Sequence, residues 1–127
     1  MEDEESYTIE VDVETNYIAE QSAPALHRYV FAYTITIHNT GSVGARLLTR
    51  HWHIKDADGR IQEVHGEGVV GVQPHIMPGE AFQYSSGAML ETSLGTMRGH
   101  YDMVADDGVR FSADIPAFVL SIPHTLH

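Results

Sequence analysis

The chain contains nine histidines, and two of them are spaced for metal chemistry. His51 and His53 are two residues apart, so in a strand their side chains project from the same face. Two imidazoles on one face suit a divalent transition metal such as Co²⁺, Ni²⁺ or Zn²⁺. A third ligand would have to come from elsewhere, for example from His65 or His75. Two solvent-facing histidines explain the same spacing, so we assign no metal site and keep His51 and His53 as candidates.

A glycine-rich loop, residues 66–74, carries the second candidate pattern. Its first six residues match the dinucleotide-binding string G-x-G-x-x-G. That string normally opens a helix whose N-terminus faces a pyrophosphate. Here Pro74 and Pro78 follow too closely for a helix to run through. The glycines therefore predict a strand or bulge with positive φ. A loop of backbone N–H groups that binds an anion is the alternative, with Arg46, Arg50 and Arg98 as candidate countercharges.

The remaining catalytic and metal patterns are incomplete. Asp56–Gly59 begins like a calcium loop, but Arg60 and Ile61 stand where an oxygen ligand and a glycine are required, so a hairpin turn is predicted. Ser85-Ser86-Gly87 has no histidine assigned within reach, and a serine-rich turn explains it. Lys55 is the only lysine. We therefore expect no catalytic residues, no cofactor and no enzymatic activity.

Hydropathy of period two dominates the chain and predicts the strands that position these residues. Apolar and polar residues alternate from Tyr7 to Glu14 and again, more strongly, from Tyr29 to His38. Further strands are expected through Leu47–Ile54, at Ile61–Val64 and Ala81–Tyr84, in a hairpin formed by 99–105 and 109–115, and at Phe118–Leu120. Residues 85–99, with three glycines, are expected to form a loop.

About seven short strands in one small domain indicate an all-β, antiparallel β-sandwich of the immunoglobulin or fibronectin type III kind. Trp52, the only tryptophan, lies in the third expected strand and is predicted to anchor the core between two sheets. The chain has no cysteine, which excludes the disulfide of true immunoglobulin domains. The fibronectin type III-like sandwich is therefore the better prediction.

The charge of the chain restricts its partners. Seven basic side chains face eighteen acidic ones, a net charge of −11, which argues against nucleic acid. Residues 1–6 are acidic and expected to be disordered, leaving 7–127 as a single domain. No apolar run is long enough to cross a bilayer, so we expect a cytoplasmic protein without membrane insertion. Divalent cations are expected to bind the acidic surface weakly and diffusely.

Several segments together resemble the ApaG family. The similarity covers nearly the whole chain from Tyr7 and preserves the spacing of glycines and prolines. The segments that carry it are Arg50-His51-Trp52, Val64–Pro74, Pro78-Gly79-Glu80, Phe82-x-Tyr84-x-Ser86-Gly87, Gly95–Gly99 with Tyr101, and Ile115-Pro116-x-Phe118-x-Leu120.

The resemblance implies a fibronectin type III-like sandwich in a cytosolic bacterial protein. It implies a link to Co²⁺ resistance and Mg²⁺ efflux, and a protein-binding role, because the same domain occurs in eukaryotic F-box proteins. The neighbouring gene of a diadenosine tetraphosphate hydrolase in bacteria suggests a nucleotide ligand as the alternative. The family supplies no established catalytic residues.

From the residues and the resemblance together we expect a non-enzymatic binding module with an unidentified protein partner and a role in Co²⁺/Mg²⁺ homeostasis. The alternative is direct binding of pyrophosphate, a nucleotide or a divalent metal. The expected binding surface is the glycine-rich loop, with Tyr84–Gly87 beside it. Its site residues are Gly66, Glu67, Gly68, Gly71, Gln73 and Pro74.

Overall fold

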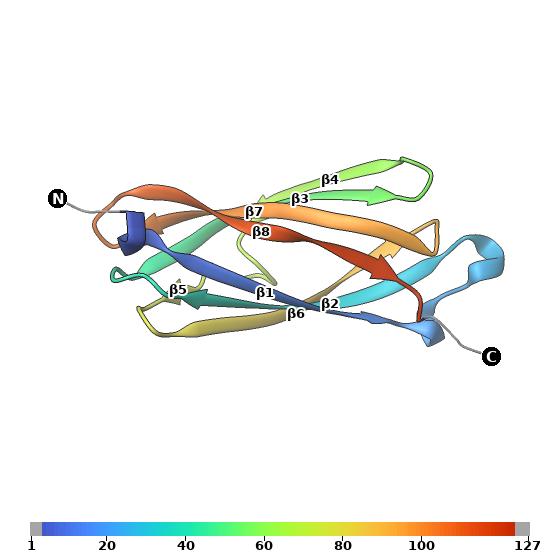
Figure 1. Cartoon of the computed structure of the whole chain (residues 1–127), viewed down its shortest axis with the longest axis horizontal. Coiled ribbons are helices and arrows are strands. Elements are labelled where there is room, and N and C mark those ends of the chain that lie inside the picture. The colour runs from blue at the N-terminus through green and yellow to red at the C-terminus, as the bar shows by residue number, and fades with distance from the viewer. Residues whose placement is uncertain (1–3, 124–127) are drawn as a thin grey trace.

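The structure, a computed structural model, describes residues 4–123 and is built from strands with three single turns of 3-10 helix (Figure 1). The turns are η1 (Glu4–Tyr7), η2 (Ala19–Gln21) and η3 (Pro24–Leu26). The strands are β1 (Ile9–Tyr17), β2 (Tyr29–Asn39), β3 (Ala45–Asp56), β4 (Ile61–Glu67), β5 (His75–Ile76), β6 (Ala81–Leu90), β7 (Leu94–Ala105) and β8 (Arg110–Ser121).

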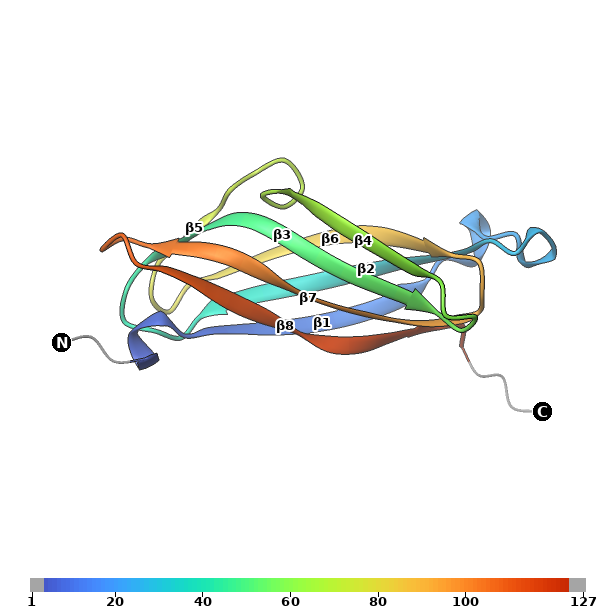
Figure 2. The same cartoon turned by 90° about the horizontal axis from the view of Figure 1, so that it is seen from above.

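The strands form two antiparallel sheets that pack face to face, as Figures 1 and 2 show. One sheet has the order β1-β2-β6, and the other has the order β4-β3-β7-β8 with β5 added to β3. The predicted all-β antiparallel sandwich is confirmed. The strands of the described residues number eight instead of about seven, because two residues after Pro74 pair with Ala45 and Arg46 as the short strand β5.

The alternation of apolar and polar residues in the sequence corresponds to an alternation of buried and less buried residues in the sheets. In β2 every second residue from Phe31 to Asn39 is buried. Trp52 of β3 is 4% exposed and meets aromatic rings of both sheets. Its ring centroid is 5.4 Å from that of Tyr33 and 5.9 Å from that of Phe118. Trp52 is therefore the core anchor that was predicted, and its neighbours His51 and His53 face outward.

The prediction of a loop at residues 85–99 is wrong, because β6 continues to Leu90 and β7 begins at Leu94. The glycines there allow strands to approach closely and do not mark turns. A Cβ on Gly99 would lie 2.0 Å from the His51 carbonyl oxygen, and one on Gly87 would lie 3.3 Å from that of Phe31. The serine-rich turn expected at Ser85-Ser86 is likewise part of β6.

The last two expected strands are one strand, β8, which runs through Pro116. A proline cannot donate a ladder hydrogen bond and is tolerated at an irregularity of the sheet. The register with β7 shifts at this point, since Met97 pairs with Phe118 but Gly99 pairs with Ile115. The shift removes the need for an N–H group at Pro116, so the strand continues.

The first turn, η1, overlaps the segment expected to be disordered. Residues 1–3 of that segment lie outside the described part of the chain, and residues 4–6 belong to η1. The Ser6 carbonyl oxygen accepts a hydrogen bond of 3.2 Å from the Ser42 N–H, which ties this turn to the loop after β2. Within residues 4–123 there is no helix long and apolar enough to cross a membrane.

Candidate functional site

The glycine-rich loop begins at the end of β4 and folds into a tight turn. Gly68, Val70 and Gly71 have φ values of 63°, 42° and 84°. Val69 and Val72 exchange two backbone hydrogen bonds of 2.8 and 3.0 Å across Val70 and Gly71. Positive φ at both central residues is typical of a hairpin turn and differs from the helix start of a dinucleotide site. The predicted positive φ is thus present at Gly68 and Gly71.

The backbone N–H groups of this turn are largely committed to the protein. Those of Val69 and Val72 bond to each other's carbonyls, and that of Gly68 donates to the Leu48 carbonyl oxygen at 2.8 Å. The Arg50 guanidinium donates to the carbonyl oxygens of Glu67 and Gly68 at 3.1 and 2.9 Å. An anion would therefore compete with hydrogen bonds that already exist, which weakens the alternative in which the loop binds an anion.

Most of the predicted loop residues hold the loop in place. Gln73 donates from its side chain to the Leu48 carbonyl oxygen at 2.9 Å, and the Pro74 carbonyl accepts from the Leu47 N–H at 3.0 Å. Gly66 lets the Arg50 side chain approach, since a Cβ there would lie 2.8 Å from its nitrogens. A Cβ on Gly68 would lie 2.2 Å from the Val72 carbonyl oxygen. Glu67 and Gly71 are the exposed members of the predicted set.

A groove of about 670 Å³ lies beside the loop, between the sheets and between their edge strands β4 and β6. Tyr33 and Trp52 line it together with Val64 of β4 and with Ser86 and Met89 of β6. Among the strands of residues 4–123, β4 pairs only with β3 and β6 pairs only with β2. Each strand therefore presents one unpaired backbone edge on this side of the sandwich.

A smaller cavity of about 280 Å³ connects this groove to the loop. Tyr33, Arg50, Trp52 and Ser86 line both spaces. The smaller one is also lined by Glu67, Val69–Gly71 and Tyr84. The structure thus brings Tyr84 and Ser86 beside the loop, as the sequence suggested, and places both at one end of the groove. The groove was not predicted from the sequence, because its prediction requires the order in which the strands pair.

Below the loop a buried pair of tyrosines joins the two sheets. The hydroxyls of Tyr84 in β6 and Tyr101 in β7 are 2.6 Å apart. Burial raises the pKa of Tyr84 to about 12 and raises the pKa of Tyr101 further above its usual range. Both side chains are therefore neutral hydrogen-bonding groups at physiological pH, and neither is a candidate general base.

The outer face of the β4-β3-β7-β8 sheet carries a row of three histidines. His65 of β4 and His100 of β7 are both in register with His51 of β3. The imidazole of His51 stacks on both, with ring centroids 4.1 Å and 4.3 Å away. The row therefore consists of three aligned rings on three neighbouring strands.

Asp102 joins this row from the next outward position of β7. Its Oδ2 lies 2.7 Å from His51 Nε2 and accepts a hydrogen bond of 2.7 Å from the Thr49 hydroxyl. Its Oδ1 lies 3.6 Å from His100 Nε2. The hydrogen bond from Thr49, followed by the contact with His51, holds the pKa of Asp102 below its usual range. Asp102 is therefore a carboxylate at neutral pH.

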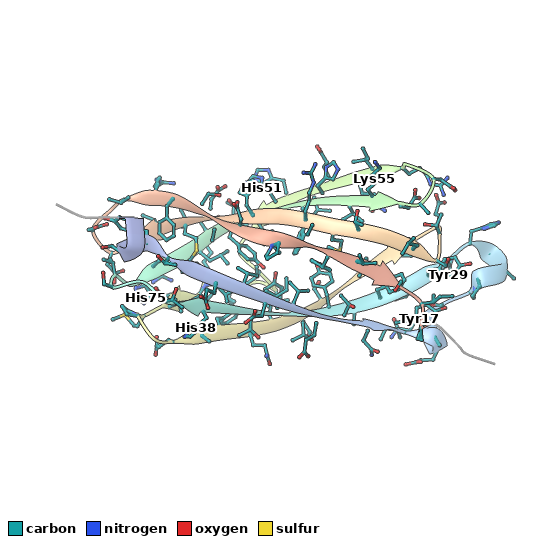
Figure 3. The ribbon with its side chains drawn as sticks, in the orientation of Figure 1. Tyr17, Tyr29, His38, His51, Lys55 and His75 are labelled. Atoms are coloured by element: carbon teal, nitrogen blue, oxygen red, sulfur yellow. The ribbon has the colours of Figure 1, made fainter. Side chains whose placement is uncertain are left out.

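The structure does not unite the two histidines that the sequence singled out. His53 lies on the same face, but its Nδ1 is 3.5 Å from Glu63, away from the row. Of the suggested third ligands, His65 stacks on His51, whereas His75 lies apart from it (Figure 3) and pairs with Asp106 at 2.7 Å. His100 and Asp102 were missed. Their own spacing of two residues in a strand was the available signal, but it needed the β3–β7 register.

Asp56 confirms that the acidic turn is a hairpin and not a calcium loop. Its Oδ1 accepts from the backbone N–H groups of Asp58 and Arg60, and its Oδ2 accepts from Arg60 Nε at 2.8 Å. Burial alone would raise the pKa of Asp56, but the hydrogen bonds, first those from Arg60, outweigh it and lower the pKa. The carboxylate is fully used within the turn.

Comparison with known proteins identifies the family of this chain. Residues 19–105 match the family model described as the ApaG domain. Proteins named ApaG from Xanthomonas campestris and Stenotrophomonas maltophilia are each 58% identical over 127 residues, covering 100% of both chains. The crystal structure of the ApaA protein from Bordetella pertussis is 49% identical, with a TM-score of 0.93 over 95% of this chain and 98% of that one. The chain therefore belongs to the ApaG family.

Proposed function

We propose that this chain is a non-enzymatic binding module that takes an extended segment of a partner protein into the groove between β4 and β6. The observation that carries the proposal is the pair of unpaired edge strands on either side of a groove floored by Tyr33 and Trp52. An extended peptide can add to such an edge through backbone hydrogen bonds, while its alternate side chains enter the groove.

Part of the rim of the groove supports an apolar ligand segment, whereas Arg60 and Glu91, which also line the groove, form an ion pair of 2.8 Å. Val64 is 37% exposed and Met89 is 53% exposed, and both line the groove. Val70 at the tip of the glycine-rich loop is 58% exposed. Aromatic floors with apolar rims are typical of protein-binding surfaces. Because the family resemblance implies a link to Co²⁺ resistance and Mg²⁺ efflux, we propose that this interaction serves Co²⁺/Mg²⁺ homeostasis.

The test uses arginine substitutions that block the groove without entering the core. We expect Val64→Arg and Met89→Arg to abolish photo-crosslinking of partners from a cell extract to a reactive group placed at Gln62. Val119→Arg is the matched control, because Val119 of β8 has the same 53% exposure as Met89 but lies away from the groove. Thermal melting of all three variants establishes that the fold is retained.

Cells lacking the gene provide the functional readout. We expect Val119→Arg to restore tolerance of Co²⁺ and Met89→Arg not to restore it. If the groove variants crosslink the same partners as the unsubstituted chain, the groove is not the interface. If they lose the partners but still restore tolerance, the interaction has another role. Amide shifts on titration with ATP, confined to the glycine-rich loop, would favour the nucleotide alternative instead.

A further inference from the structure

We propose that the histidine row on the outer face of the β4-β3-β7 sheet is a binding site for a divalent transition metal, with His51, His100 and Asp102 as the protein ligands. Their ligand atoms all lie within 4.8 Å of one another. The site is separate from the groove, because it lies on the opposite face of the same strands. The inference does not depend on the proposed function.

The three ligand atoms lie close enough to reach one small cation once the His100 ring turns out of its stack on His51, because each imidazole binds a metal in its own ring plane. His51 Nε2 and His100 Nε2 lie 2.7 and 3.6 Å from the two oxygens of the same carboxylate. Ligand atoms separated by distances of this order can share one metal that lies about 2.0–2.2 Å from each of them. For His51 to bind through Nε2, the proton on that nitrogen would pass by way of solvent to Nδ1, so that the ring stays neutral, and the metal would replace the hydrogen bond to Asp102.

The sheet places the three ligand residues side by side before any metal arrives. His51 and His100 are direct partners in the β3–β7 ladder, and Thr49 and Asp102 are the next outward pair. Gly99, beside His100, allows β7 to lie close to β3, since a Cβ there would meet the His51 carbonyl oxygen at 2.0 Å. Ligands on paired strands are positioned more accurately than ligands on loops.

Neighbouring side chains orient the ligands as they do in established metal sites. The Thr49 hydroxyl donates to Asp102 Oδ2 at 2.7 Å and fixes the carboxylate. His65 stacks on the face of the His51 ring opposite His100 and restricts its rotation. Such contacts around the direct ligands commonly change metal affinity by about 10–100-fold. Thr49 and His65 are therefore positioning residues for this site.

The donor set selects the class of metal. Two imidazoles and one carboxylate suit Zn²⁺, Co²⁺, Ni²⁺ or Fe²⁺, whereas Mg²⁺ prefers oxygen ligands alone. Three protein ligands leave coordination positions for water or for a group from another molecule. The side chains of His51, His100 and Asp102 are 32%, 40% and 46% exposed, so a metal can reach them from solvent. The formal charge of −11 favours a cation.

The experiment is a competition titration of the full chain with Zn²⁺, together with visible spectroscopy of the Co²⁺ complex. We expect one saturable site, ligand-field bands of a nitrogen- and oxygen-coordinated Co²⁺, and no displacement by millimolar Mg²⁺. Side-chain NMR of the imidazoles should show the first changes at His51 and His100. Displacement of the metal by Mg²⁺ would overturn the assignment.

Substitutions separate this site from other histidines of the chain. We expect His100→Asn and Asp102→Asn each to weaken Zn²⁺ binding at least tenfold, and Thr49→Val to weaken it by about tenfold. His75→Asn is the matched control, because the His75–Asp106 pair has the same 2.7 Å contact and similar exposure but lies outside the three-ligand group. Circular dichroism checks that each variant is folded. If His100→Asn and Asp102→Asn bind Zn²⁺ as tightly as His75→Asn, the proposal is wrong.

Discussion

The hydrogen bond between Tyr84 and Tyr101 gives a sharp test of how the two sheets are joined. The hydroxyl oxygens are 2.6 Å apart, and the two side chains come from β6 and β7, on opposite sheets. Tyr101 is 0% exposed and Tyr84 is 7% exposed. Each hydroxyl is the other's partner, so replacing either tyrosine by phenylalanine leaves a buried polar group without it.

The expected magnitudes follow from that loss. A buried hydroxyl deprived of its partner costs about 1–3 kcal/mol, whereas removing both hydroxyls leaves rings of the same shape and is close to neutral. Tyr84→Phe should cost more than Tyr101→Phe. Tyr84→Phe leaves the Tyr101 hydroxyl without a partner, and this hydroxyl is fully buried. Tyr101→Phe leaves the Tyr84 hydroxyl, which water can reach because Tyr84 lines the cavity beneath the loop. For a chain of 127 residues, 1 kcal/mol corresponds to roughly 3–5 °C in Tm.

The assay is a double-mutant cycle by urea unfolding, with the fluorescence of Trp52, the only tryptophan, as the probe. We expect both single variants to be less stable than the double variant, with a coupling free energy of about 2–6 kcal/mol, the sum of the two single losses, and an unchanged m-value. If the effects of the two single substitutions simply add in the double variant, the hydroxyls do not interact and the account of the inter-sheet contact is refuted.

Three further predictions concern pH and the strand geometry. Burial raises the pKa of Tyr84 to about 12 and that of Tyr101 further, whereas an unfolded tyrosine ionises near pH 10, so stability should be insensitive to these groups below about pH 10 and fall above it. Urea unfolding at pH 9 and pH 11 should show a smaller loss in the Phe/Phe double variant. Gly99→Ala should lower the free energy of unfolding by about 1–3 kcal/mol through overpacking against a backbone carbonyl, with Gly87→Ala as a milder control; equal melting temperatures would contradict this. Because its hydrogen bonds lower the pKa of Asp56, its contribution should be present above about pH 4 and be lost as the pH falls further, and Asp56→Ala should remove that acid sensitivity in thermal melts more than Asp58→Ala does.

The sheet architecture could be predicted because it depends on local alternation. The period-two pattern of β2 and the two predicted hairpins, one turning at Asp56–Gly59 and one between 99–105 and 109–115, are properties of consecutive residues, and the structure confirms both. The wrong predictions concern a glycine and a proline whose positions are explained by pairing between strands and not by a turn. Gly99 lies where β7 approaches β3, and Pro116 lies at a register shift, so neither ends a strand.

The candidate sites were less predictable for the same physical reason. His51 could be recognised from the sequence, but its ring contacts come from other strands, at His65 and His100. Which residues face one another across strands is set by register, and register depends on packing between distant parts of the chain. The glycine-rich loop has the positive φ values that its sequence predicted. Most of its residues hold the loop in place, and Glu67 and Gly71 are the exposed members of the predicted set.

Strand β4 explains how one small domain can carry two chemically distinct surfaces. Val64 and Gln62 of β4 line the groove, while His65 and Glu63 contact the histidines of the outer face. Because successive side chains of a strand point to opposite faces, a substitution at Val64 changes the groove without touching a metal ligand. The proposed metal ligands lie on β3 and β7, so a substitution at His100 leaves the groove wall intact. The two proposals are therefore separable by single substitutions, and loss of one function with retention of the other is the outcome that this alternation requires.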